Sequence, residues 1–197
     1  MTSPVPRAWR ECRVTLPQPH TWLVLDLESR EPESWTREAA SGHVAPAVPE
    51  TVREAFALDL LWYWRAAVGQ GALCAAVLAP PDSAVIAFFT VRQLTGPAER
   101  LSVDAFRAEA LHARQARFGD QELSEVRVPL GPALRVHRKE PMAPDAAHGL
   151  VVEGVAHYVV AREHATALEC RLLWSALGFG EVLTEIADEL AGSVRLV

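Results

Sequence analysis

The sequence predicts an α+β fold, in which one twisted antiparallel sheet of about six to eight strands carries helices packed on its faces. Two observations support this class. Short apolar or alternating runs, separated by Gly, Pro or polar turns, recur along the chain, and longer segments between them repeat their apolar residues at helical spacing. The chain has 197 residues, of which 50% are hydrophobic and 22% charged, and no linker divides it. We therefore expect a single domain spanning residues 1–197.

The N-terminal part is expected to begin with a hairpin. Residues 11–16 and 22–27 are strand-like, and the segment between them contains Pro17 and Pro19, which favour a turn. Between residues 22 and 27, leucines at every second position, beginning with Leu23, fall on one side of an extended chain. This alternation indicates a strand with one solvent-facing side. Residues 32–40 then predict a short helix.

Residues 50–69 form the clearest helix of the sequence. Pro49 precedes it at a favourable position, and Gly69 and Gly71 mark its end. Six apolar side chains fall on one face at helical spacing: Val52, Phe56, Leu60, Tyr63, Trp64 and Ala67.

The remaining segments alternate between strands and helices. Residues 72–79 and 84–94 are nearly continuous apolar runs, which predict central strands covered on both sides. A helix is expected at 102–118. The last part of the chain predicts four strands, a helix and a short strand, at 122–128, 133–138, 150–162, 167–174, 180–191 and 193–197.

Charge and cysteine content exclude several classes of protein. The net charge is −6, and the arginines alternate with acidic residues, so a nucleic-acid partner is not expected. Cys12, Cys74 and Cys170 are an odd number without metal-ligand spacing, which indicates reduced and mostly buried thiols. No segment reaches the roughly 18 apolar residues of a membrane span. We expect a cytoplasmic protein with no membrane span, no metal site and no cofactor.

One set of ionisable residues could support catalysis, because a carboxylate beside an imidazole can tune a general base. Alternation along the strands is consistent with a common sheet face for Arg135, His137, Glu153, His157, Glu169 and Arg171. The simpler interpretation is a row of cross-strand charge pairs on a solvated face, each contributing about 0.2 to 1 kcal/mol. No nucleophile pattern accompanies them, so we predict no catalytic residue.

The helix at 50–69 carries more apolar surface than one sheet face needs. If Tyr63 and Trp64 face the sheet, then Trp62, with Leu58 and Leu61, must face elsewhere. That surface is covered either by the segment around Trp35 or by another protein. The sequence therefore predicts a partner-binding surface made of Leu58, Leu61, Trp62 and Trp35, with a second protein or a second copy as partner.

The two ends of the chain resemble those of a known superfamily. The opening LPQPHTWLVLDL at residues 16–27, and the closing LECRLLW at 168–174 with IADELAGSVRL at 186–196, resemble the Mog1/PsbP/LpqN-like superfamily. The chain is also similar to small actinobacterial proteins that accompany type VII secretion or toxin genes. This resemblance implies a binding or assembly role, although LpqN-like members carry an export or lipidation signal that we do not expect here.

These observations predict a non-enzymatic protein-binding or assembly module. The setting that the resemblance implies is an accessory role in a secretion or toxin system. Two alternatives stay open. The protein could carry an apolar small molecule in a pocket between helices and sheet. It could also be an enzyme that uses the face containing His137, Glu153 and His157.

Overall fold

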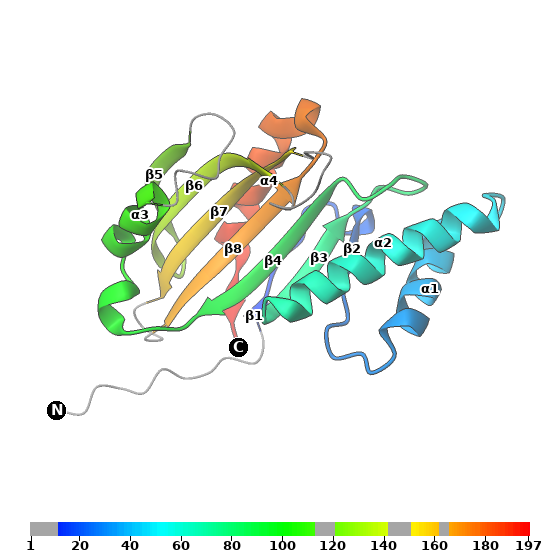
Figure 1. The fold of residues 1–197 in the computed structure, drawn as a ribbon, viewed down its shortest axis with the longest axis horizontal. Helices are drawn as coiled ribbons and strands as arrows, with labels where there is room; N and C mark the ends of the chain where they lie inside the picture. Colours follow the sequence, from blue (N-terminus) through cyan, green and yellow to red (C-terminus); the bar gives the residue numbers. More distant parts are fainter. Residues whose placement is uncertain (1–11, 113–120, 142–150, 162–165) are drawn as a thin grey trace.

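A seven-stranded antiparallel sheet forms the centre of the molecule, which confirms the predicted α+β class (Figure 1). The computed structural model describes residues 12–112, 121–141, 151–161 and 166–197. The strands are β2 (Trp22–Val24), β3 (Ala72–Leu78), β4 (Ala87–Leu94), β5 (Glu122–Val128), β6 (Gly131–Pro141), β7 (Val151–Ala161) and β8 (Thr166–Trp174). Their order across the sheet is β2-β3-β4-β8-β7-β6-β5.

The sheet consists of two blocks that follow one another in the sequence. Strands β5 to β8 form the expected meander, and β3 pairs with β4 and β2 to form the other block. The blocks join where β4 pairs with β8, with Phe88 opposite Leu173. The turn between β5 and β6 requires Gly131, since its φ is 151° and a Cβ there would lie 2.2 Å from the carbonyl oxygen of Val160.

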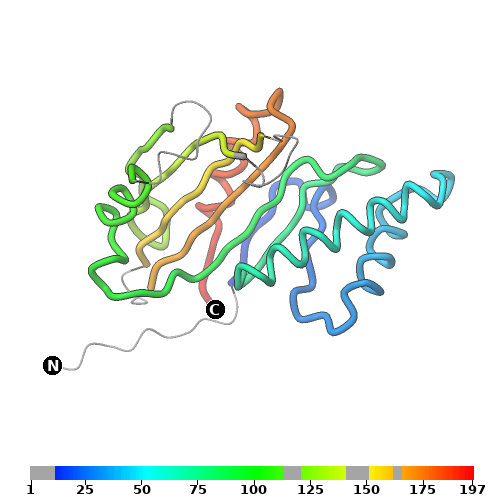
Figure 2. Tube along the Cα trace, in the orientation of Figure 1, coloured from blue at the N-terminus to red at the C-terminus, as the bar shows by residue number. Residues whose placement is uncertain are grey.

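The prediction of an N-terminal hairpin is wrong. Strand β1 (Cys12–Arg13) pairs with the C-terminal strand β9 (Arg195–Leu196), whereas β2 pairs with β3. The two prolines do form a turn, but Gln18 adopts a left-handed conformation and the chain continues as a short 3-10 helix at Pro19–Thr21. This turn leads β2 to the edge of the main sheet, so β1 finds its partner at the other end of the chain (Figure 2).

Helices cover both faces of the sheet. Helices α1 (Pro32–His43), α2 (Glu50–Gly69) and α3 (Val103–His112) lie on one face, and α4 (Gly180–Ser193) lies on the other together with β1 and β9 (Figure 1). The predicted extension of α3 to residue 118 lies outside the described residues. No helix in the described ranges is both long and apolar enough to cross a membrane.

Alternation along the central strands distributes the core between these two faces. In β4, Phe88 packs with α2, and its neighbour Phe89 packs on the α4 side. Leu183 and Leu190 of α4 are almost completely buried against the strands. Burial of one such side chain stabilises the fold by about 1.5 to 3 kcal/mol, so this face is a large part of the core.

Candidate functional site

Helix α2 is held against the sheet by the apolar face that the sequence predicts. Phe56, Leu60 and Ala67 are buried, and they pack with Val77 and Phe88 of the sheet. The helix begins after Pro49 and ends at Gly69, where Gly71 adopts a φ of 66°. Helix α2 is therefore held against the sheet from Phe56 to Ala67, whereas the prediction that Val52 belongs to the buried face is wrong, since Val52 in the first turn is 49% exposed.

Two of its aromatic residues face the molecule. Trp64 donates a hydrogen bond from Nε1 to the carbonyl oxygen of Asp26 at 2.7 Å. The ring of Tyr63 lies 4.9 Å from that of Phe88, and burial raises the pKa of its hydroxyl, with a contribution from the charge of Asp59. These contacts tie α2 to the β2–α1 connection and to the sheet.

The four predicted partner-binding residues separate into two groups. Leu58 and Trp62, one turn apart on α2, are 66% and 50% exposed. Leu61 is buried, and Trp35 is half-buried and packs with the core between α1, α2 and the sheet. The segment around Trp35 therefore leaves Leu58 and Trp62 exposed. We call the exposed pair, Leu58 and Trp62, the α2 ridge.

A hollow lies on each side of the α2 ridge. One, between α1 and α2, has a volume of about 260 Å³ and is lined by Leu58 and Leu61 together with Thr36. The other, also of about 260 Å³, lies between α2 and the sheet and is lined by Trp62 and Trp174 among others. The ridge therefore stands between two depressions large enough to accept side chains.

The charges beside the ridge have both signs, since Arg37 lines the same hollow as Glu33 and Glu54. Arg65 is paired with Glu33 at 2.9 Å, so its charge is compensated within the chain. Glu54 and Asp59 form no ion pair with the residues that the structure describes. Burial raises the pKa of Asp59, which indicates that its carboxylate is not compensated by a nearby cation.

The predicted grouping of six ionisable residues on one sheet face is partly wrong. Arg135, His137, Glu153 and His157 point toward α4. Glu169 and Arg171 point to the opposite face, because Cys170 is the residue of β8 that pairs with His157. The face beneath α4 is also not solvated, since Glu153 is 7% and His157 2% exposed.

The four residues beneath α4 form two separate clusters. His137 Nε2 lies 2.8 Å from Oε1 of Glu153, whose second oxygen accepts a hydrogen bond from Trp174 Nε1 at 3.3 Å. His157 Nε2 lies 2.9 Å from Oδ1 of Asp188 in α4. His137 and Glu153 therefore meet, whereas His157 belongs to the other cluster.

Asp188 contacts both an arginine and a histidine. Arg135 Nε donates to its Oδ1 at 2.8 Å, and the same oxygen faces His157. Partial burial alone would raise the pKa of Asp188, but the hydrogen bonds and charges of His157 and Arg135 hold it below its usual range. This cluster fastens α4 to β6 and β7.

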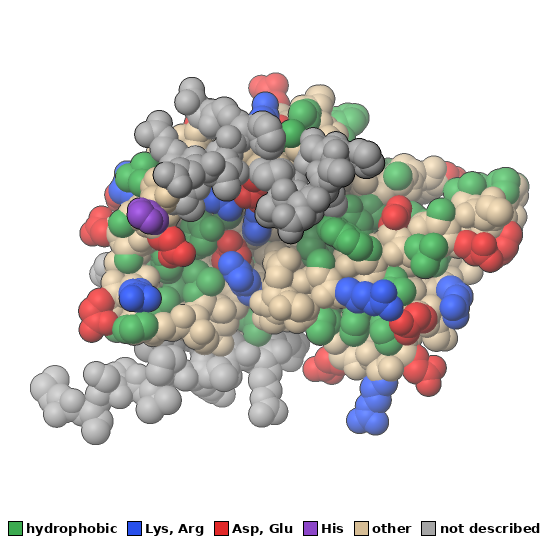
Figure 3. Space-filling model, viewed as in Figure 1, with side chains coloured by type: hydrophobic (Ala, Val, Ile, Leu, Met, Phe, Trp, Pro, Cys, Tyr) green, Lys and Arg blue, Asp and Glu red, His purple; other side chains and the backbone are tan. Residues whose placement is uncertain are grey.

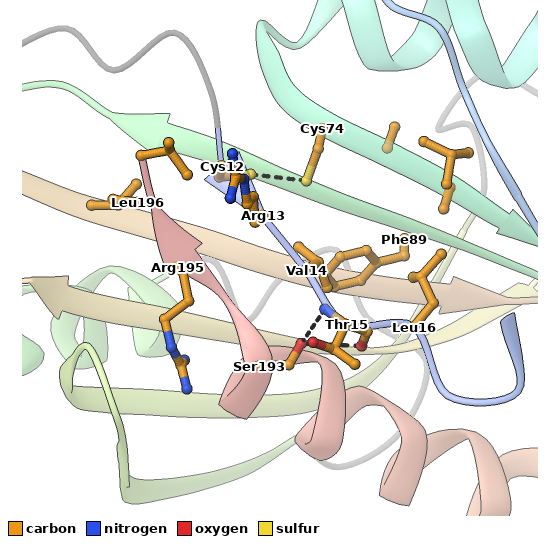
Figure 4. A pocket seen from close by; sticks show the side chains of 14 residues that line it. Cys12, Arg13, Val14, Thr15, Leu16, Cys74, Phe89, Ser193, Arg195 and Leu196 are labelled. Carbon is orange, nitrogen blue, oxygen red and sulfur yellow. Dashed lines mark hydrogen bonds between the residues drawn. The ribbon is translucent and has the colours of Figure 1, made fainter.

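Cys12 and Cys170 are buried and Cys74 is half-buried, and the side chains of Cys12 and Cys74 are in contact. Cys170 is 1% exposed among apolar neighbours, and burial raises its pKa far above the usual range. The thiol of Cys12 donates to Cys74 Sγ at 2.9 Å, at the wall of a cavity of about 740 Å³ beside β1 and β9 (Figure 4). The hydrogen bond with Cys12 and burial raise the pKa of Cys74. The sequence contains no signal for this contact, because it depends on the pairing of β1 with β9.

Within the described parts of the chain, no group of three or more His, Cys, Asp or Glu side chains is arranged to hold a metal ion. Comparison with known proteins adds no identification. Neither a family model nor a curated protein matches this sequence.

Proposed function

We propose that this chain is a protein-binding module that docks a partner protein on the α2 ridge. The observation that carries the proposal is the exposure of Leu58 and Trp62, at 66% and 50%, on a helix whose other face is fixed to the sheet. Exposed tryptophan on a rigid element is typical of interface hot spots, because its large apolar area loses little conformational entropy on binding.

The surroundings of the ridge indicate what the partner offers. The two flanking hollows suit apolar side chains on either side of Trp62. Asp59 lies beside Leu58, and its raised pKa has burial as its cause with no cation nearby among the described residues, which favours a partner with a basic group next to its apolar contact. The partner surface is therefore expected to be apolar at its centre and basic at its rim.

The resemblance to the Mog1/PsbP/LpqN-like superfamily, whose members act mainly as binding or assembly factors, supports this function. A cytoplasmic accessory of a secretion or toxin system is the setting that we propose for it. Self-association through the same ridge is the alternative for which the experiment below includes a separate measurement.

The proposal is tested with Trp62→Ala and Leu58→Asp in a pulldown from the native cells. Both variants are expected to lose the partner that the wild type retains, and to keep the wild-type thermal melting temperature within a few degrees, because exposed positions contribute little to stability. The control is Val182→Asp on α4, since Val182 is 56% exposed and lies on the opposite side of the sheet.

Two further measurements locate the contact. Light scattering over a range of concentrations reports self-association, and a photo-crosslinking residue at position 62 reports which partner touches the ridge. Retention of every partner by both ridge variants, with no crosslink from position 62, would exclude the proposal.

A further inference from the structure

A strip of the sheet between α2 and α3 is covered by neither helix. In this strip the side chains of β4, β6 and β8 are charged, and Figure 3 shows cationic and anionic side chains gathered between the two helices (Figures 1 and 3). Arg92, Arg138, Glu140, Glu169 and Arg171 all point to this face. We call these five residues the arginine strip.

The arginine strip is a network of ion pairs, and one of its carboxylates is buried. Arg92 Nε donates to Glu169, whose side chain is only 3% exposed. Glu140 bridges two cations, with Arg138 Nε at 2.8 Å from one oxygen and Arg171 at the other. Each carboxylate is thus already engaged, and each guanidinium still has N–H groups beyond those in these ion pairs.

Positive charge exceeds negative charge around this strip. Burial, and then repulsion by Arg138 and Arg92, lower the pKa of Arg171 to about 10. A fourth cation, Arg100, lies near Arg92 and Arg138 and forms no ion pair with any residue that the structure describes. At Arg92, burial alone would lower the pKa, but the hydrogen bond and charge of Glu169 outweigh this effect and raise the pKa, so the cation without a partner here is Arg100.

A cavity of about 410 Å³ lies next to the strip, under α3. This volume falls in the range of about 300 to 1,000 Å³ that is usual for small-molecule sites. Its lining includes three arginines, one glutamate and two aromatic rings: Arg92, Arg100, Arg138, Glu109, Phe106 and Tyr158.

The two aromatic rings form one wall of the cavity. The centroids of Phe106 and Tyr158 are 5.4 Å apart, with the planes tilted by 32°. Burial, and then the charge of Glu169 and a hydrogen bond to it, raise the pKa of Tyr158, so the hydroxyl stays protonated. The cavity thus combines a cationic wall with an aromatic wall.

We propose that this cavity binds a small molecule that carries an oxyanion, either a phosphate or a carboxylate, attached to a short planar apolar body. The oxyanion lies between Arg92, Arg100 and Arg138, where planar guanidinium groups can donate paired hydrogen bonds to it. The body packs on Phe106 and Tyr158. This site is separate from the α2 ridge, so either proposal can fail without the other.

The experiment uses the full chain and three probes that share a ring: phenyl phosphate, benzoate and the neutral benzyl alcohol. Binding is measured by isothermal titration calorimetry and by chemical-shift changes of the backbone amides in NMR spectra. We expect one or both anions to bind, with spectral changes at Phe106 and Tyr158, and benzyl alcohol to bind at least tenfold more weakly. The relative affinities of phenyl phosphate and benzoate show which oxyanion the site prefers.

Variants locate the site. Arg100→Gln, in the short helix Ala98–Arg100, is expected to lower the affinity for the preferred anion by at least about tenfold, because the anion loses a charge-assisted hydrogen bond. Arg138→Gln is expected to have a similar effect. The control is Arg65→Gln, since Arg65 is 63% exposed and lies on α2 away from the cavity.

Two results would overturn the proposal. One is the absence of binding by both anions at millimolar concentration. The other is unchanged affinity in Arg100→Gln, whose described contacts include no ion pair that the fold depends on. Spectral changes confined to residues outside the cavity would likewise show that the anions bind elsewhere.

Discussion

The two faces of the sheet bury charged residues in different ways. On the α4 face, His157 and Glu153 are 2% and 7% exposed, and a single helix lies over them. On the other face, two helical blocks leave the arginine strip between them, and Arg92 is 35% exposed at its side chain. The first polar region thus lies beneath a helix, and the second lies between two helices.

This difference separates structural charges from charges available for binding. Beneath α4, each carboxylate is engaged by groups of the same chain, as Asp188 is by Arg135 and His157. In the arginine strip, guanidinium groups keep donors beyond their ion pairs and line a cavity. The charges beneath α4 therefore fasten that helix to the sheet, and the two binding proposals concern the opposite face.

The largest effect is expected in the core beneath α4. Leu190→Ala removes a side chain that is 0% exposed, and it should lower the free energy of unfolding by about 3 kcal/mol, since a cavity adds to the lost burial. Chemical denaturation measures this change. Val182→Ala on the same helix, at an exposed position, should change it by less than about 0.5 kcal/mol. A similar loss in both variants would contradict the assignment of the core to this face.

A smaller effect is expected in the arginine strip. Glu169→Leu leaves Arg92 without its partner and should cost about 2 kcal/mol, whereas the double variant Arg92→Met with Glu169→Leu should recover most of that loss, because an apolar pair can replace a buried ion pair. A double-mutant cycle by denaturation provides the measurement. Additive losses would show that the two residues act independently.

The smallest effect concerns Asp188 and depends on pH. Its pKa is lower in the folded chain than the value of about 3.9 in an unfolded chain, so its stabilisation is complete above that value and is lost as the pH falls through the folded pKa. Asp188→Asn should therefore be less stable than the wild type by about 1 kcal/mol at pH 7, a modest value because the side chain is 46% exposed. The difference should shrink below about pH 4 in denaturation curves, and a difference that grows on acidification would contradict this account.

Local patterns predict the elements well, and pairing across the chain poorly. The helical spacing from Phe56 to Ala67 predicts α2 and predicts that Trp62 lies off the side facing the sheet, because a helix repeats within one segment. Leu61 is buried because α1 packs beside α2, and no spacing within α2 reveals that neighbour.

The errors arise where strands had to be aligned with one another. Alternation shows that Glu169 and Arg171 share a side of β8, but only the register with β7 shows which side that is. The prediction of an N-terminal hairpin is wrong for the same reason, since β1 pairs with a strand at the far end of the sequence. The arginine strip was missed because its five residues come from three strands.

The pairing of β1 with β9 also determines the topology of the chain. Arg13 lies opposite Arg195, and Ser193 Oγ accepts a hydrogen bond from the amide of Thr15 at 3.0 Å. The backbone from β1 to β9 therefore forms an almost closed loop, with its two ends side by side. A circular permutant that joins the paired strands by a short linker and opens the chain in an exposed turn would preserve every strand neighbour in the sheet.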